Sequence, residues 1–321
     1  VVNVVQFSVS SLNRIFGVIV DTHAARNNLS GGAKMAMSVV IQATVDLFNA
    51  LALEMRPTPK KSHYIFNLRD LSNVFQGLLN ADPTLLVTNV NVARLWVHEC
   101  LRVFSDRLID DDDRGWMRKQ VSDVILPGAF KLNWKNVVEV RVPRLDAAAE
   151  GDADLGEEKQ ATRDAEPLPP LLFGSFTDSQ KFGDQRQYMD LGPFGHGDLI
   201  ALVQSYLGEY NMSRSDGGMD LVLFMYCIEH VVRVCRVLGQ MGGNALLVGV
   251  GGSGRKSVTA LAAFMSNQKL EQIELTKSYG FFEWREDLKR IMRQSGLDDQ
   301  ETVFQLSDTQ LVDEVFVEDI N

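Results

Sequence analysis

The sequence predicts an all-α domain followed by a parallel α/β domain. Residues 8–130 carry apolar side chains at helical spacing, which favours a set of packed helices. From residue 219 onward, short apolar runs typical of strands alternate with helical segments, and this order favours a parallel sheet. A glycine-rich stretch between one such run and a helix has the context of a phosphate-binding loop.

Four amphipathic helices are expected in the first half of the chain. Each shows apolar residues three and four positions apart, so that these residues share one face. The expected helices cover residues 10–20, 33–55, 67–79 and 91–108, and a strand is expected over residues 1–7. Asn67 is placed to cap the third helix, because its side chain can accept a backbone N–H hydrogen bond.

The composition changes in the middle of the chain. Residues 146–166 contain eight acidic and two basic side chains among many small residues. Such a stretch cannot bury enough apolar surface to fold by itself. We therefore expect an acidic linker or surface insertion at residues 144–169, between a helical domain at residues 1–143 and an α/β domain at residues 170–321.

The second domain is expected to alternate helices and strands. The apolar patterns predict helices over residues 219–238 and 258–265, and a further helix containing Trp284 and Leu288. Strands are expected over residues 245–250, 270–275 and 302–306. In a parallel sheet of this kind, ligands bind at the carboxyl ends of the strands.

Charge, hydropathy and cysteine use argue against several classes of function. The net charge of −10 disfavours nucleic acid or an anionic membrane as a partner. No apolar run of about 18 residues is apparent, so a membrane span is not expected. The three cysteines lack C-x-x-C spacing and are expected to be buried, reduced thiols.

Two features that could suggest metal sites are assigned structural roles. Asp110–Asp113 are consecutive, and consecutive residues of a helix cannot converge on one ion. A solvated turn that benefits from the helix dipole is expected there. The five histidines are scattered singly, without a partner at ligand spacing. Neither feature therefore predicts a metal site.

The glycine-rich loop spans Gly249 to Ser257. Glycines allow successive backbone N–H groups to point at a phosphate, and the start of the next helix adds its positive dipole end. We expect these N–H groups and the side chains of Arg255 and Lys256 to contact phosphate oxygens. The candidate nucleotide-binding residues are Gly249, Gly251, Gly252, Ser253, Gly254, Arg255, Lys256 and Ser257.

The loop departs from the common pattern G-x-x-x-x-G-K-[ST]. With Gly249 and Gly254 as the fixed glycines, Arg255 occupies the lysine position and Lys256 the Ser/Thr position. Either cation could reach the β- or γ-phosphate, arginine as a planar fork and lysine as a point charge. Ser257 comes one place late for the hydroxyl that usually binds Mg²⁺. The alternative is a glycine-rich turn that only packs a helix on a sheet.

A second element of a nucleotide site is expected where the strand at residues 302–306 ends. An aspartate for Mg²⁺ and a glutamate that orients water are usual there, but Ser307 takes the first position and Asp308 the second. Serine is a poor direct metal ligand, and aspartate is one methylene shorter than glutamate. Asp308 is a weak candidate for catalysis and for holding Mg²⁺ through water. Binding with weak or no turnover is predicted, and a helix cap by Ser307 or Asp308 is the alternative.

Long stretches of the sequence resemble the dynein heavy chain family. Residues 61–77 and 97–114 are similar to the helical small domain of its third AAA+ module. Similarity to the start, the P-loop and the Walker B segment of the fourth module is found at residues 170–176, 221–230, 243–254 and 304–310. The resemblance implies a helical AAA+ small domain followed by part of a P-loop NTPase large domain, within a longer heavy chain.

The resemblance also implies ligands and partners. The nucleotide would be ATP or ADP, at a fourth module that is regulatory in this family. Arg69 matches the sensor-II arginine, which would face the nucleotide of the third module. Arg255 and Ser307–Asp308 are similar to axonemal heavy chains. Expected partners are the other modules of the heavy chain, microtubules through a stalk, and intermediate and light chains, in the axoneme of a cilium or flagellum.

Three functions remain open from the sequence. The leading hypothesis is a fragment of an axonemal-type heavy chain that binds nucleotide as a conformational ligand, without efficient hydrolysis. The second is a hydrolysing ATPase site in which Lys256 replaces the usual lysine. The third is an empty loop in a segment that only transmits force.

Overall fold

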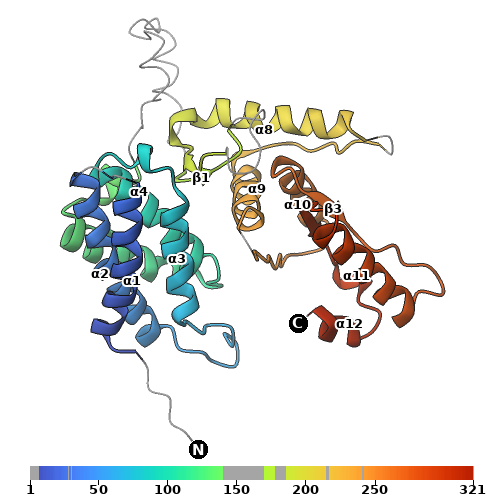
Figure 1. The fold of residues 1–321 in the computed structure, drawn as a ribbon, viewed down its shortest axis with the longest axis horizontal. Helices are drawn as coiled ribbons and strands as arrows, with labels where there is room; N and C mark the ends of the chain where they lie inside the picture. The colour runs from blue at the N-terminus through green and yellow to red at the C-terminus, as the bar shows by residue number, and fades with distance from the viewer. Residues whose placement is uncertain are drawn as a thin grey trace, which may run out of the picture. The chain divides into compact units, whose positions relative to one another are not determined.

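The computed structural model describes residues 7–27, 29, 31–139, 170–177, 186–214, 217–240 and 242–320. They form two compact units, which can be followed by colour in Figure 1. The first unit contains Val1–Phe173 and Gln187–His196, and the second contains Gly174–Arg186 and Gly197–Asn321. Residues 1–6 of the expected first strand and the predicted acidic linker at 144–169 lie outside the described residues.

The first unit is helical. Its α-helices are α1 (Val9–Arg26), α2 (Gly31–Glu54), α3 (Leu68–Asn80), α4 (Asn89–Cys100), α5 (Asp111–Lys119) and α6 (Trp134–Val137). Two π-helical segments, Leu101–Ser105 and Gln120–Phe130, continue α4 and α5, and short 3-10 turns cover Pro83–Leu85 and Gly192–Phe194. All four helices expected from the periodicity are present.

Local hydrogen bonds explain where these helices begin. The Ser8 hydroxyl accepts a bond from the Ser11 backbone N (3.2 Å) at the start of α1. At α3, the Arg69 N donates to Asn67 Oδ1 (2.9 Å), and the Asn67 N donates to Asp70 Oδ2 (2.8 Å). This reciprocal arrangement is a capping box. The predicted cap at Asn67 is therefore confirmed.

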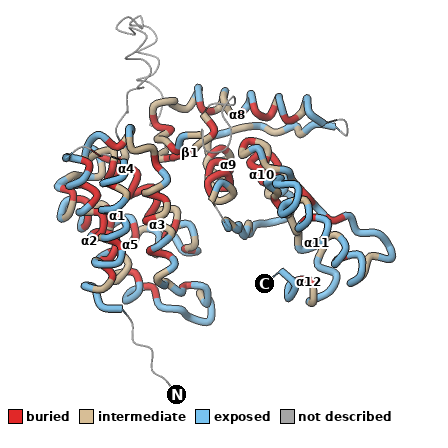
Figure 2. Tube along the Cα trace, in the orientation of Figure 1, coloured by how far each residue is buried: buried red, intermediate tan, exposed pale blue. Residues whose placement is uncertain are grey.

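Helix α2 lies at the centre of this unit. It contacts α1, α3 and α4, and Met37, Leu47 and Leu51 on it are fully buried. The indole of Trp96 on α4 is also fully buried, and its Nε1 donates to the Thr44 hydroxyl of α2 (2.9 Å). Figure 2 shows the buried residues along these helices. The predicted apolar faces of α2, α3 and α4 thus join one core with Leu12 and Phe16 of α1, whereas Ile15 and Ile19, which were expected on the same face, are exposed.

The length and composition of α2 would also allow it to cross a membrane. This finding corrects the expectation that no apolar run of that length exists. Half of its most apolar stretch is buried inside the protein. A core helix of this kind passes the same test of length and hydropathy as a membrane span.

Residues 187–196 pack with the helical unit, although they follow the expected domain boundary. Strands β1 (Phe173–Gly174) and β2 (Met189–Asp190) form a two-stranded sheet. Tyr188 forms a parallel bridge with Ala81, just after α3 ends. This segment is therefore attached to the helices by backbone pairing as well as by side chains.

The second unit alternates helices with two short strands. Its elements are α8 (Gly195–Met212), which begins in the first unit, then α9 (Met225–Leu238), α10 (Arg255–Met265), β3 (Lys269–Glu271), α11 (Phe281–Gly296), β4 (Thr302–Phe304) and α12 (Val315–Ile320). Strands β3 and β4 pair in parallel, with Lys269 opposite Thr302 and Glu271 opposite Phe304. The parallel pairing is as expected, and both strands are shorter than expected.

Of the elements expected in this unit, one helix begins later than predicted and one strand is wrong. The helix expected over residues 219–238 begins only at Met225. The strand expected over residues 245–250 is not formed, and Leu246 and Val248 are 91% and 86% exposed. A strand needs neighbours that satisfy its backbone N–H and C=O groups, but β3 and β4 pair only with each other within the described ranges. The apolar run therefore has no sheet to join there.

The acidic run at Asp110–Asp113 lies at the start of α5, as expected, but it is not wholly solvated. Asp113 accepts hydrogen bonds from Lys61 Nζ (2.5 Å) and from the Tyr64 hydroxyl (2.8 Å). Burial raises the pKa of the Asp113 carboxyl, but these hydrogen bonds outweigh burial and hold the pKa below its ordinary value. Among the described residues, no group of three or more His, Cys, Asp or Glu side chains could hold a metal ion.

The three cysteines are free thiols. Cys100 and Cys235 are buried and Cys227 is half-buried, so the expectation of buried thiols holds for two of them. Burial raises the pKa of the Cys235 thiol to about 12. The thiol is therefore protonated and poorly nucleophilic at neutral pH.

Candidate phosphate-binding loop

The glycine-rich loop forms a tight turn that leads directly into α10. Gly252 and Gly254 have left-handed backbone angles, with φ of 78° and 77°. The Ser253 N donates to the Val250 carbonyl (3.3 Å), and the Val258 N donates to the Gly254 carbonyl (2.8 Å). Residues with a Cβ rarely adopt such angles, which explains why glycine occupies these two positions.

The later glycines of the loop face open space. A Cβ built on Gly251, Gly252 or Gly254 would meet no atom within 4 Å, so this side of the loop is open. At Gly249, by contrast, a Cβ would lie 3.0 Å from the Ser253 hydroxyl. The loop therefore packs on itself at its first glycine and leaves backbone accessible at the later ones.

The two cations of the loop differ in orientation. The half-buried Arg255 turns back on its own loop, where its Nη2 donates to the Val250 carbonyl (3.4 Å). Lys256 is exposed, and no ion pair between described residues involves it. Ser257 is half-buried in the first turn of α10. Of the two predicted cations, Lys256 is thus the one presented to solvent.

Ser307 and Asp308 follow β4 and have different surroundings. Ser307 caps the 3-10 turn Asp308–Gln310, and its N and Oγ both donate to Gln310 Oε1 (2.8 and 2.9 Å). The alternative of a cap at Ser307 is therefore confirmed. Asp308 is exposed, and its Oδ1 accepts a bond from the Thr309 N (3.0 Å). The serine hydroxyl is thus engaged, whereas the aspartate carboxylate faces solvent.

Arg69 lies in the first unit, at the second position of α3. It is exposed, and its backbone N takes part in the capping box described above. Among the described residues, no hydrogen bond or ion pair involves its guanidinium group. Its backbone is fixed by the cap while its side chain extends into solvent.

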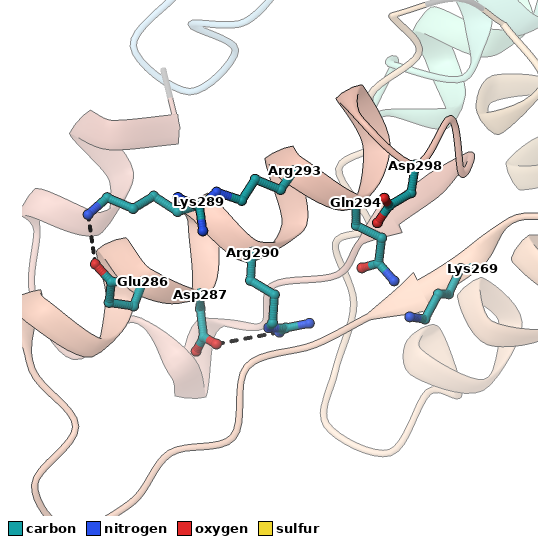
Figure 3. Close-up of a pocket in the computed structure, with 8 residues that line it drawn as sticks. All are labelled: Lys269, Glu286, Asp287, Lys289, Arg290, Arg293, Gln294 and Asp298. Carbon is teal, nitrogen blue, oxygen red and sulfur yellow. Dashed lines mark hydrogen bonds and ion pairs between the residues drawn. The ribbon is translucent and has the colours of Figure 1, made fainter.

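A polar groove of about 610 Å³ lies along α11, as Figure 3 shows. Its lining residues are Lys269, Glu286, Asp287, Lys289, Arg290, Arg293, Gln294 and Asp298. Lys289 pairs with Glu286 (2.7 Å), and Arg290 pairs with Asp287 (3.4 Å). Lys269 is the first residue of β3, so the groove reaches the amino end of the strand. Ligands of parallel sheets bind at the opposite end, so this groove is not the candidate nucleotide site.

Family models match both units. One described as "P-loop containing dynein motor region D4" matches residues 219–321, which include the loop and Ser307–Asp308. One described as "AAA+ lid domain" matches residues 40–131, which include Arg69. The order of the two matches is that of the helical and α/β parts of the sequence.

Full-length similarity agrees with these matches. Dynein axonemal heavy chain 3 of Mus musculus is 39% identical over 100% of this chain, and Dynein axonemal heavy chain 2 of the same species is 39% identical over 97%. The Dynein-1-beta heavy chain, flagellar inner arm I1 complex, of Chlamydomonas reinhardtii is 36% identical over 97%. This chain belongs to the dynein heavy chain family. It spans 6–7% of the length of these relatives, and the resemblance inferred from its motifs is confirmed.

In this dynein heavy chain segment, the predicted loop residues lie together in one turn, and Asp308 lies in a separate loop. No hydrogen bond or ion pair between described residues joins Gly249–Ser257 to Ser307 or Asp308. Gln310 was missed by the sequence reasoning. Its signal was the spacing Ser307-x-x-Gln310, which is the pattern of a capping box.

Proposed function

We propose that this chain is a fragment of an axonemal-type dynein heavy chain in which the loop Gly249–Ser257 binds ATP or ADP as a regulatory ligand, with weak or no hydrolysis. Residues 1–143 would end the third AAA+ module, residues 144–169 would link the two, and residues 170–321 would begin the fourth. The match to the dynein motor region supports the assignment of residues 170–321, and the match to the lid domain supports that of residues 1–143.

The observation that carries this proposal is the contrast between the two candidate elements. The loop has the left-handed glycines and the open backbone that phosphate binding needs. At the other element, both donors of Ser307 are bound to Gln310, so its hydroxyl is engaged rather than presented to a metal ion. The loop thus offers groups suited to phosphate binding, whereas the segment after β4 offers few groups suited to hydrolysis.

Each candidate residue would have a limited role. The N–H groups of Gly252, Ser253 and Gly254 would bind phosphate oxygens, and exposed Lys256 would neutralise their charge. Mg²⁺, when bound, supplies charge neutralisation between phosphate oxygens. Asp308 would hold it through water. Arg69 would instead face the nucleotide bound to the third module.

Such a nucleotide would act by its differential affinity for two conformations of the motor. The proposed partners are the remaining modules of the heavy chain, microtubules reached through a stalk, and the intermediate and light chains of the complex. The named relatives are axonemal or flagellar, which supports a place in the axoneme.

Thermal unfolding with and without ATP tests binding. ATP is expected to raise the melting temperature, because a ligand that binds the folded state stabilises it. Gly254→Val should abolish this shift, since it strains and fills the open loop. The matched control is Gly217→Val, because Gly217 also has a left-handed φ (97°) and no atom within 4 Å of a built Cβ. Equal ATP shifts in both variants would favour the empty-loop hypothesis.

A second candidate function is ATP hydrolysis at this site. The exposed carboxylate of Asp308 is the observation that favours it. Single-turnover hydrolysis, measured on the heavy chain with its other P-loops inactivated, separates the two functions. Turnover that is lost in Asp308→Asn but kept in Asp313→Asn, an exposed aspartate of the same segment, would favour the enzyme. No turnover in the wild type supports the regulatory site.

A further inference from the structure

The side chain of Gln310 joins the chain segments that follow the two parallel strands. Its Oε1 accepts bonds from Ser307 N (2.8 Å) and Ser307 Oγ (2.9 Å). Its Nε2 donates to the Ile273 carbonyl (2.7 Å). Ile273 follows β3 and Ser307 follows β4, so one carboxamide spans the carboxyl end of the sheet.

The two segments that Gln310 joins are each held by other contacts. Ile273 is 3% exposed and packs in an apolar cluster with Trp284 and Phe316. The rings of Trp284 and Phe316 are stacked, with centroids 4.5 Å apart. At the other end, the Gln305 N continues the strand pairing by donating to the Glu271 carbonyl (2.9 Å). Gln310 therefore restrains the turn of Asp308 relative to a packed element.

Asp308 lies in the chain between Ser307 and Gln310, whose side chain bonds back to Ser307. It follows Ser307 directly and begins the 3-10 turn that Gln310 ends. Its carboxylate is exposed and makes a local bond to the Thr309 N (3.0 Å). The direction of the carboxylate is therefore set by the backbone of this turn, and Gln310 holds that backbone in place.

We propose that Gln310 is a positioning residue of the nucleotide site, which holds the Asp308 carboxylate where it can take part in binding nucleotide-bound Mg²⁺. This inference rests on the proposed function, because it requires nucleotide at the loop Gly249–Ser257. Gln310 itself touches neither nucleotide nor metal. It acts through the hydrogen bonds to Ser307 and Ile273.

The test compares ATP affinity with Mg²⁺ and with EDTA, in the heavy chain with its other P-loops inactivated. The ratio of the two affinities isolates the contribution of the metal. Gln310→Met has a similar length but no hydrogen bonds, and is expected to reduce this ratio about fivefold or more. Its affinity in EDTA should stay within about twofold of wild type, because the glycine loop is untouched. A purely structural role would lower both affinities together.

Gln305→Met is the matched control. Gln305 lies on the same segment, and its side chain bonds to Gln272 instead of spanning Ser307 and Ile273. This variant should keep the wild-type ratio. Should Gln310→Met fail to fold, Gln310→Glu replaces it, since a carboxylate still accepts from Ser307 but cannot donate to the Ile273 carbonyl.

The experiment distinguishes failure of the proposed function from failure of the positioning role of Gln310. Absence of ATP binding in the wild type, with or without Mg²⁺, would contradict the proposed function. ATP binding with a ratio of one in the wild type, or with a ratio that the Gln310 variants leave unchanged, would overturn the positioning role alone.

Discussion

The guanidinium group of Arg94 on α4 donates two hydrogen bonds to the carboxylate of Asp190 on β2. The Nε–Oδ2 distance is 2.6 Å and the Nη2–Oδ1 distance is 3.2 Å. The two side chains are only 3% and 15% exposed. Arg94 also donates to the Val137 carbonyl, and Asp190 accepts from the Gly192 N. This pair fixes residues 187–196 on the helical unit.

Removing one partner of this pair should destabilise the helical unit strongly. Arg94→Met leaves the Asp190 carboxylate in a largely buried place without its counter-charge. The expected loss in the free energy of unfolding is about 3–5 kcal/mol, measured by urea denaturation. Arg114→Met removes a similar contact with Asp111, but those side chains are 48% and 97% exposed. That control should cost about 0.5 kcal/mol or less, and similar losses in both variants would contradict the argument.

A hydrogen bond between Tyr188 and Glu99 is a second attachment of the same segment. The Tyr188 hydroxyl donates to Glu99 Oε1 (2.6 Å), and the Glu99 side chain is fully buried. Tyr188→Phe removes this bond while keeping the ring, and should cost about 1–3 kcal/mol in the free energy of unfolding. Tyr226→Phe is the control, because the Tyr226 side chain is largely exposed. A loss below about 0.5 kcal/mol for Tyr188→Phe would show that the bond adds nothing net.

The glycines of the candidate loop at Gly249–Ser257 should differ in their tolerance of a side chain. Gly254→Ala forces an alanine into a left-handed φ of 77°, which should cost about 1–2 kcal/mol of stability. Gly251 does not have a left-handed φ, and a Cβ built on it has no atom within 4 Å. The stability of Gly251→Ala should therefore match that of the wild type. Chemical denaturation of the two variants without nucleotide measures the difference. Equal stabilities would mean that the left-handed turn is not kept in solution.

Stability should depend on pH through Glu271, which joins β3 to α11. Burial raises the pKa of its carboxyl, but hydrogen bonds from Arg290 and Lys269 outweigh burial and hold the pKa below the ordinary value of 4.5. Because the folded-state pKa is the lower one, the carboxylate stabilises the fold above pH 4.5, and this contribution is lost as the pH falls further.

Glu271→Gln is therefore expected to flatten the acid side of the stability curve. Urea unfolding at a series of pH values between about 3 and 6 measures the slope. Arg290→Met should flatten it too, because it removes the nearer partner of the carboxylate (2.7 Å). An unchanged slope in Glu271→Gln would exclude this carboxylate as a source of the pH dependence.

Local patterns in the sequence predicted much of the helical unit. The apolar spacing of α1 to α4 was sufficient to place these helices, although α4 is buried on all sides from Val92 to Cys100. The cap at Asn67 was predictable because it involves residues three positions apart. The loop at Gly249–Ser257 was predictable for the same reason, since its turn is made by its own glycines.

Pairing between distant segments was not predictable in this way. The run at residues 245–250 has the composition of a strand, but a strand forms only where a neighbour pairs with it, and none does among the described residues. The attachment of Tyr188 and Asp190 to the helical unit joins residues about ninety positions apart. The local sequence pattern of neither segment predicts such a contact.

The sequence by itself determined the family, the first four helices and the glycine turn at Gly249–Ser257, because each is encoded in residues that are close along the chain. Only the tertiary structure decided that Gln310 bonds to the Ile273 carbonyl, that Lys256 rather than Arg255 faces solvent, and that residues 187–196 belong with the helices. These outcomes depend on hydrogen bonds, burial and side-chain direction, which only the folded chain brings together.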